Sequence, residues 1–150
     1  MTTGSGSSDT NSQIIDLQNP YSKCENWANF PIQIVQATGQ VIGTDVIICG
    51  GAWPGMYTSN CYKLGPESVV SLPNLSTAKS SSSSGVFNNA LFVTGGYDGF
   101  GGSGGYFSTT EYISENERQD GVSIPIKVDC HCVIQVNENE ILLTGGNDGR

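Results

Sequence analysis

The chain contains three apolar segments that each end in a pair of glycines. They run from Val46 to Gly51, from Leu91 to Gly96 and from Ile141 to Gly146. The first glycines of the pairs lie 45 and then 50 residues apart (95 − 50 and 145 − 95). Self-similarity at such a period indicates one supersecondary unit that is built several times. The repeat therefore constrains the fold strongly, and no catalytic constellation accompanies it.

A hydrophobic residue followed by proline precedes each glycine pair at a nearly constant distance. The three steps are Phe30-Pro31, Leu72-Pro73 and Ile124-Pro125, and the gaps are 19, 22 and 20 residues (50 − 31, 95 − 73 and 145 − 125). A hydrophobic-proline step and a glycine pair that are separated by nearly the same number of residues in three places do not arise readily by chance. We therefore expect a disordered polar tail over 1–12 and a repeat region over 13–150, with repeats near 31–72 and 73–124 and an incomplete one over 125–150.

Between the two landmarks the pattern predicts a hairpin. Its first strand is expected at 32–37, 77–82 and 128–133, and its turn at 39–40, 85–89 and 137–139. The second strand is the apolar one, whose unbroken hydrophobicity is typical of a strand buried on both faces. Glycine at its end would allow close backbone approach at a crowded hub. The glycines to which we assign this structural role are Gly50, Gly51, Gly95, Gly96, Gly145 and Gly146.

Two further short strands are expected after each of the first two glycine pairs. The third strand carries a tyrosine, Tyr62 in 60–64 and Tyr112 in 109–113, and the fourth is expected at 69–71 and at 122–123. Four short antiparallel strands in roughly 50 residues are typical of a propeller blade. The sequence thus predicts an all-β fold.

The hydrophobic-Gly-Gly strand ends, the step Thr110-Glu111-Tyr112 and the aromatic-to-proline step from Trp27 to Pro31 resemble the kelch-repeat family over about 24–150. The resemblance implies a partial β-propeller, with about two complete four-stranded blades and parts of flanking blades. Kelch propellers typically close with six or seven blades, so the chain is expected to be a fragment or to associate with copies of itself. Residues 24–38 look like the outer end of one blade and the start of the next, a segment that could close a ring.

Charge and hydropathy restrict the partners. The chain has 14 acidic and 6 basic residues and a net charge of −8. The basic residues are scattered, so nucleic acid and anionic membranes are poor partners. No apolar run reaches the ~18 residues that span a bilayer, and membrane insertion is not expected.

Five cysteines are present. Cys49 and Cys61 flank the first glycine loop on consecutive strands of one expected blade, so a disulfide between them is geometrically feasible. The alternative is that both are small hydrophobic residues in a reducing cell. Asn74-Leu75-Ser76 is a glycosylation sequon. The compartment stays open: extracellular if a leader is missing from this reading frame, otherwise cytoplasmic.

The triplet Cys130-His131-Cys132 is the most reactive-looking one in the chain. On a strand, the two cysteines would share one face and His131 would point to the other, so the three could not converge on a metal. We therefore expect no metal site here and cysteines buried on an inner face. Galactose oxidase has a similar propeller, but the copper site that this similarity would imply needs two histidines, and the chain has one.

These observations favour a non-catalytic scaffold without a cofactor that binds a protein partner through its blade loops, chiefly 52–60 and 97–108. Aromatic residues on loops of a rigid frame are typical interface anchors. The candidate contact residues are Trp53, Tyr57, Tyr97, Phe100, Tyr106 and Phe107. The alternatives are the N-terminal part of a larger secreted carbohydrate-acting protein, and a glycan-binding surface that uses Trp53.

Overall fold

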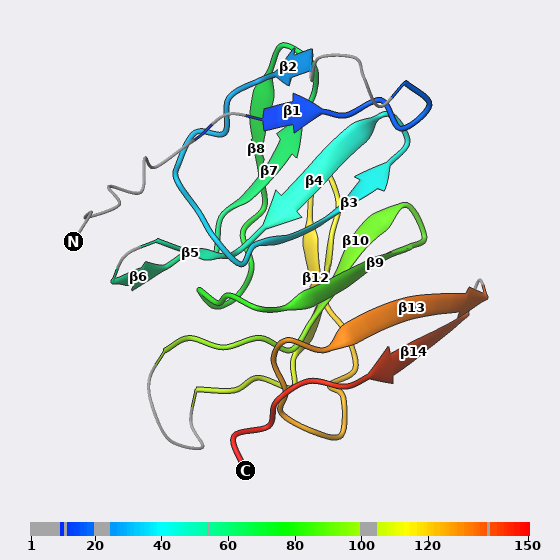
Figure 1. Cartoon of the computed structure of the whole chain (residues 1–150). Coiled ribbons are helices and arrows are strands. Elements are labelled where there is room, and N and C mark those ends of the chain that lie inside the picture. The colour runs from blue at the N-terminus through cyan, green and yellow to red at the C-terminus, as the bar shows by residue number, and fades with distance from the viewer. Residues whose placement is uncertain (1–9, 11, 20–24, 54, 100–104, 138) are drawn as a thin grey trace.

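The computed structural model describes residues 10, 12–19, 25–53, 55–99, 105–137 and 139–150. Over these residues the chain is all-β, with strands in several antiparallel sheets, none of them closed, and without a helix (Figure 1). The predicted fold class is confirmed at this level. The tail predicted over 1–12 falls largely outside the described residues, although Ser12 already belongs to a strand.

Two four-stranded sheets form the centre of the molecule. The first has the order β3 (Thr38–Ile42), β4 (Asp45–Cys49), β7 (Cys61–Leu64) and β8 (Val69–Leu72). The second runs β9 (Ser83–Phe87), β10 (Ala90–Thr94), β11 (Thr110–Ile113) and β12 (Arg118–Asp120). A small hairpin of β5 (Ala52–Trp53) and β6 (Met56–Tyr57) interrupts the connection from β4 to β7.

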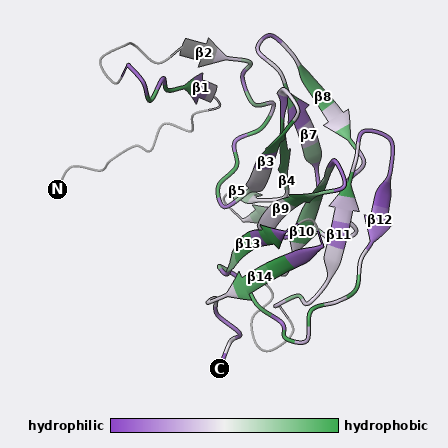
Figure 2. Cartoon of the chain, turned by 90° about the vertical axis from the view of Figure 1, so that its right-hand side faces the viewer, coloured by the Kyte–Doolittle hydropathy of each residue, from purple (hydrophilic) through white to green (hydrophobic). Residues whose placement is uncertain are grey.

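A two-stranded hairpin lies on either side of this pair of sheets. The N-terminal one pairs β1 (Ser12–Ile14) with β2 (Glu25–Trp27), and the C-terminal one pairs β13 (Cys132–Asn137) with β14 (Glu140–Thr144). The two hairpins lie at opposite ends of the molecule (Figure 2).

The apolar strands that end in glycine pairs are β4, β10 and β14, as predicted. The prediction for the strands that precede them is wrong, because β3, β9 and β13 begin four to six residues later than expected (38 − 32, 83 − 77 and 132 − 128). Each expected strand contains a non-glycine residue with positive φ, which interrupts the extended chain: Gln36 (57°), Ser81 (54°) and Cys130 (50°). Ladder pairing starts only after these residues.

Two further details differ from the expectation. Gly39 lies inside β3, so the first hairpin turn comes later in the chain than 39–40. Gly85 likewise lies inside β9, but the second turn, at Asn88 and Asn89, falls within the predicted 85–89. The third strands and β8 lie where predicted, but the fourth strand expected at 122–123 is wrong: the segment that pairs with β11 is β12, Arg118–Asp120.

The two tyrosines of the third strands are not equivalent. Tyr62 lies opposite Ile48, two residues before Gly50, whereas Tyr112 lies opposite Phe92, three residues before Gly95. A shift of one residue moves a strand side chain to the other face of the sheet. The residue that occupies the position of Tyr62 in the second sheet is therefore Glu111.

The backbone hydrogen bonds between successive sheets recur. Ser81 N donates to Gln36 O at 3.0 Å, and Cys130 N donates to Ser81 O at 2.9 Å, so equivalent residues of neighbouring units bond to one another. Likewise Gly51 N donates to Lys79 O and Gly96 N to Val128 O, each at 2.8 Å. The three units thus follow one another with the same spatial relation.

Close approach at these points requires glycine. A Cβ built on Gly50 would lie 2.6 Å from Lys79 O, and one on Gly95 would lie 2.4 Å from Val128 O. Both glycines also have positive φ (66° and 65°). The glycine pairs therefore lie where each unit contacts the next one along the chain.

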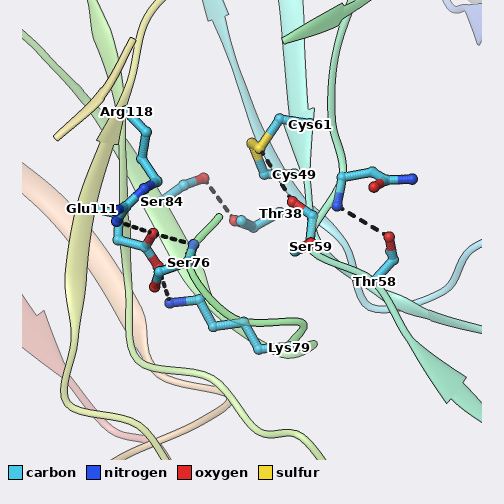
Figure 3. The surroundings of a disulfide bond; sticks show 11 residues. Thr38, Cys49, Thr58, Ser59, Cys61, Ser76, Lys79, Ser84, Glu111 and Arg118 are labelled. Atoms are coloured by element: carbon cyan, nitrogen blue, oxygen red, sulfur yellow. Dashed lines mark hydrogen bonds and ion pairs between the residues drawn. A yellow bond between two sulfur atoms is a disulfide. The ribbon is translucent and has the colours of Figure 1, made fainter. Parts of the chain in front are cut away.

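The core lies between the two four-stranded sheets. Its side chains come from β4, β7 and β8 of the first sheet, from β10 and β11 of the second, and from the segment that joins the sheets: Ile47, Cys49, Cys61, Leu72, Leu75, Leu91, Val93 and Ile113. The first strands of the sheets also touch, because Thr38 Oγ1 donates to Ser84 Oγ at 2.7 Å (Figure 3).

Candidate binding surface at the glycine ends of the sheets

Three of the six predicted contact aromatics meet in one cluster. The rings of Tyr57 and Tyr97 lie edge to face with centroids 6.3 Å apart, and those of Tyr97 and Tyr106 are tilted at 5.0 Å. All three side chains are half-buried. We call Tyr57, Tyr97 and Tyr106 the tyrosine cluster.

Backbone pairing holds the central ring of the tyrosine cluster in place. Tyr97 N donates to Ser80 O at 2.9 Å, and Ser80 N donates back to Tyr97 O at 2.8 Å. Tyr97 also forms a bridge with Tyr106. The two ends of the glycine-rich loop are thereby joined, which limits the conformational entropy that binding would remove.

The third unit contributes to the tyrosine cluster as well. Asn147 Nδ2 donates to Tyr106 Oη at 2.9 Å, and a Cβ on Gly149 would lie 2.7 Å from the Tyr106 ring. Tyr57 comes from the first unit and packs on Gly99, where a Cβ would lie 2.4 Å from the ring. Residues that follow three successive glycine pairs therefore converge on one surface.

Tyr97, the central ring of the tyrosine cluster, is neutral at physiological pH and lies near acidic groups. Burial raises the pKa of Tyr97, and the neighbouring tyrosines, Asp98 and Asp129 raise it further. Neutral phenols can both donate and accept hydrogen bonds, and their ring faces attract cations. Asp148, in the same region of the third unit, has a lowered pKa because Arg150 hydrogen-bonds to it. This chemistry suits a partner that presents apolar groups and hydrogen-bond donors.

The other predicted contact residues lie elsewhere. Trp53 borders a shallow depression with Pro31 and Ile32. The ring of Phe107 lies 5.7 Å from Lys79 Nζ, so it covers a buried cation. Phe100 lies outside the described residues.

The tyrosines to which we assigned a structural role are packed against aromatic residues. Tyr62 meets Phe30 edge to face at 5.2 Å, and Tyr112 lies 5.3 Å from the ring of Phe92 and 5.8 Å from that of Phe87. Tyr62 thus packs against the segment that precedes the first unit, and Tyr112 packs within the second unit.

Sequence reasoning missed a buried ion pair in the second unit (Figure 3). Lys79 Nζ lies 2.8 Å from Glu111 Oε1, and both side chains are fully buried. Glu111 Oε2 also accepts hydrogen bonds from Ser76 N at 2.7 Å and from Arg118 Nη1 at 3.1 Å. The partners are 32 residues apart in the chain, and only their place in the repeat connects them.

Burial and hydrogen bonding shift the pKa of Glu111 in opposite directions. Burial raises its pKa, but the hydrogen bond and charge of Lys79 and the bond from Ser76 outweigh burial, so the pKa lies below its ordinary value. Glu111 is therefore ionised at neutral pH. The ion pair fixes the segment before β9 to β11, next to the tyrosine cluster.

The predicted disulfide between Cys49 and Cys61 is confirmed in the structure (Figure 3). The two residues are directly opposite on β4 and β7, with Cα atoms 4.1 Å apart, and both are buried. The disulfide fixes the base of the loop that carries Tyr57.

The expectation that Cys130 and Cys132 are buried is wrong. Both thiols are free and exposed, whereas His131 is only 7% exposed. The alternation itself holds, but the buried side is that of His131, whose ring lies against Gly95, where a Cβ would be 2.6 Å from it. Burial lowers the pKa of His131, against the opposing charge of Asp129. Within the described residues, no three His, Cys, Asp or Glu side chains are grouped so that they could hold a metal ion.

No family model matches the chain, and no curated protein matches it significantly. In the described part of the chain, no helix has the length and apolar character needed to cross a membrane.

Proposed function

We propose that this chain is a kelch-type propeller segment that acts as a non-catalytic scaffold, and that the tyrosine cluster is its contact surface for a protein partner. The recurrent hydrogen bonds from Ser81 to Gln36 and from Cys130 to Ser81 support the propeller arrangement. Sheets that radiate from one axis bring equivalent residues of neighbouring blades together, and these bonds have that relation.

The observation that carries the binding proposal is the convergence of Tyr57, Tyr97 and Tyr106 from loops of different units. Tyrosine is enriched among interface residues that contribute most of the binding energy, because it combines a large apolar area with a polar tip. A disulfide and a buried ion pair rigidify the base of these loops.

Site-specific photocrosslinking tests the proposal. A photoreactive phenylalanine analogue is placed at Tyr57 and, as a control, at Gln119 on the exposed β12. Proteins captured only from position 57 are identified and purified, and their affinity for the chain is measured by calorimetry. For an anchor worth about 2 kcal/mol, Tyr57→Ala should weaken binding by roughly 30-fold, while Gln119→Ala should leave it unchanged. Equal capture from both positions, or equal affinity of both variants, would contradict the proposal.

A second candidate is a secreted protein with a glycan-binding surface. The Cys49–Cys61 disulfide and the exposed Asn74 of the sequon favour an oxidising compartment. A glycan array separates the two functions. Binding that is lost in Trp53→Ala and kept in Tyr57→Ala would favour glycan recognition and place it away from the tyrosine cluster.

A further inference from the structure

We propose that Asn74 is an acceptor for N-linked glycosylation, and that its oligosaccharide lies on the exposed segment that joins the first four-stranded sheet to the second. The proposal does not depend on the binding function of the tyrosine cluster, because it concerns another residue and another kind of ligand. It rests on the acceptor triplet, on the exposure of that triplet in each unit and on the Cys49–Cys61 disulfide.

The triplet Asn74-Leu75-Ser76 has the acceptor pattern, with a central residue that is not proline. It lies between β8, which ends at Leu72, and β9, which begins at Ser83, so no sheet pairing has to be broken there. No other asparagine of the chain is followed two positions later by serine or threonine. The sequence therefore offers one acceptor.

The fold presents both outer residues of the triplet to solvent. Leu75 is only 4% exposed and packs in the core between the two sheets, whereas Asn74 and Ser76 on either side of it are exposed. Burial of the central side chain holds this segment on the surface of the protein. An oligosaccharide on the Asn74 amide would lie in solvent, as linked glycans do.

Exposure at this position recurs along the chain. One backbone hydrogen bond is found in three equivalent places: Phe30 N to Thr10 O at 2.8 Å, Leu75 N to Ser59 O at 2.8 Å, and Ile124 N to Ser108 O at 2.9 Å. The residues that precede the three donors are all exposed: Asn29, Asn74 and Ser123. The exposure of Asn74 is therefore a property of the repeated unit.

Ser76 distinguishes the second unit from the other two. The residues that follow Phe30 and Ile124 are prolines, whereas the one that follows Leu75 is a serine. Proline has no N–H, but Ser76 N donates to the buried Glu111 Oε2 at 2.7 Å (Figure 3). A serine that supports the buried ion pair thus also completes the acceptor triplet. Because Glu111 comes 35 residues later, the nascent triplet is free before this bond forms.

The disulfide supports the compartment that the modification requires. Cys49 and Cys61 are bonded and buried in the same unit that ends just before Asn74. Disulfides form and persist in oxidising compartments of the secretory route, where the N-x-Ser/Thr pattern is read. The disulfide and the acceptor triplet therefore point to the same route.

The group transferred is an oligosaccharide from a polyisoprenyl diphosphate donor. Nδ2 of Asn74 forms a bond to the anomeric carbon of the first sugar, and the bond from that carbon to the diphosphate oxygen breaks. The diphosphate leaves with the electron pair, and the amide gives up one proton to a base of the transferase. The product is a neutral amide, so the linkage itself adds no charge beside the core.

Secretion of the full chain from animal cells, behind a cleavable leader, tests the proposal. Peptides that contain Asn74 are analysed by mass spectrometry before and after treatment with the amidase that releases N-linked glycans. The amidase converts a modified asparagine to aspartate, and heavy-oxygen water labels that residue. We expect most secreted chains to carry a glycan at Asn74 and none at another asparagine.

Matched variants separate the acceptor pattern from other effects. Asn74→Gln keeps an exposed amide, and Ser76→Ala keeps the N–H that Glu111 accepts, yet both should lose the glycan completely. Ser76→Thr preserves the pattern and should retain it. In the Asn74→Gln background, Pro31→Ser gives the equivalent and exposed Asn29 the acceptor pattern, so it should restore one glycan.

Two results would overturn the proposal. The first is an unmodified Asn74 in secreted wild-type chains whose Cys49–Cys61 disulfide is closed, which the same digest reports. The second is a glycan that persists in both Asn74→Gln and Ser76→Ala, because it would have to be attached elsewhere. Neither result would bear on partner binding by the tyrosine cluster, which is measured separately.

Discussion

Lys79 Nζ lies 2.8 Å from Glu111 Oε1, with neither side chain exposed to solvent. Lys79 also donates to Thr109 Oγ1 at 3.1 Å, and its backbone carbonyl accepts a bond from Gly51 of the preceding unit. One residue therefore connects two sheets through its backbone and fixes β11 through its side chain. The stability of the second unit should depend on this pair.

Removing one member of the pair should be more harmful than replacing both. Glu111→Gln leaves the Lys79 charge buried without a counter-charge, which typically costs about 3–5 kcal/mol. The double variant Lys79→Met/Glu111→Leu leaves no buried charge there, so it should cost much less than the sum of the two single changes. Urea denaturation of the single variants Lys79→Met and Glu111→Leu and of the double variant measures the three free energies of unfolding. Additive losses would show that the pair is not coupled.

Acid should destabilise the protein through Glu111. Its folded-state pKa is lowered from the ordinary 4.5, so ionisation stabilises the fold fully above about pH 4.5, and this contribution is lost as the pH falls through the lowered value. The free energy of unfolding should thus decrease with acidification below pH 4.5. Glu111→Gln should show a shallower decrease over the same range. Parallel curves for the two proteins would refute the assignment.

Reduction of the Cys49–Cys61 disulfide should loosen the first unit. The cysteines are 12 residues apart, and closing a loop of this size stabilises a fold by roughly 3 kcal/mol in the chain-entropy model. We expect dithiothreitol to lower the free energy of unfolding of the wild type by this amount. Cys49→Ala/Cys61→Ala should be equally destabilised and should not respond to the reductant. A response of this variant to the reductant would point to other thiols.

Glycine at the contact between units should be more sensitive than glycine in an open turn. Gly95 and Gly43 have almost the same φ, 65° and 63°, but a Cβ at Gly95 would meet Val128 O at 2.4 Å, while none of the described atoms lies within 4 Å of one at Gly43. Gly43→Ala should cost only the strain of the left-handed conformation, about 1–2 kcal/mol. Gly95→Ala should cost at least twice as much, because the next unit must also move. Equal thermal shifts for the two variants would argue against close contact there.

Much of the fold could be predicted because glycine and apolar strands leave a clear local pattern. β4, β10 and β14 lie where the glycine pairs placed them, and β7, β8 and β11 follow. The starts of β3, β9 and β13 could not be predicted, because Gln36, Ser81 and Cys130 adopt positive φ although none is glycine. Contacts between units impose that conformation, and local propensity does not report it.

The residues of the candidate site could also be predicted only in part, because some of their contacts depend on tertiary packing that the local sequence does not report. Tyr57, Tyr97 and Tyr106 meet because their loops follow equivalent strands of neighbouring units, which the repeat suggested. The role of Phe107 depends on Lys79, whose burial follows from tertiary pairing with Glu111. The N-terminal hairpin was missed because β1 has no glycine pair or tyrosine, and only the bond from Phe30 to Thr10 reveals its place in the repeat.

The central claim is that successive sheets follow one another around a common axis, with equivalent residues in contact. Nuclear Overhauser spectra of the isotope-labelled protein test it most directly. We predict cross-peaks from the amide proton of Ser81 to the α-proton of Gln36, and from the amide proton of Cys130 to the α-proton of Ser81, with both amides slow to exchange. Assigned spectra in which these amides exchange freely and show no such cross-peaks would contradict the account.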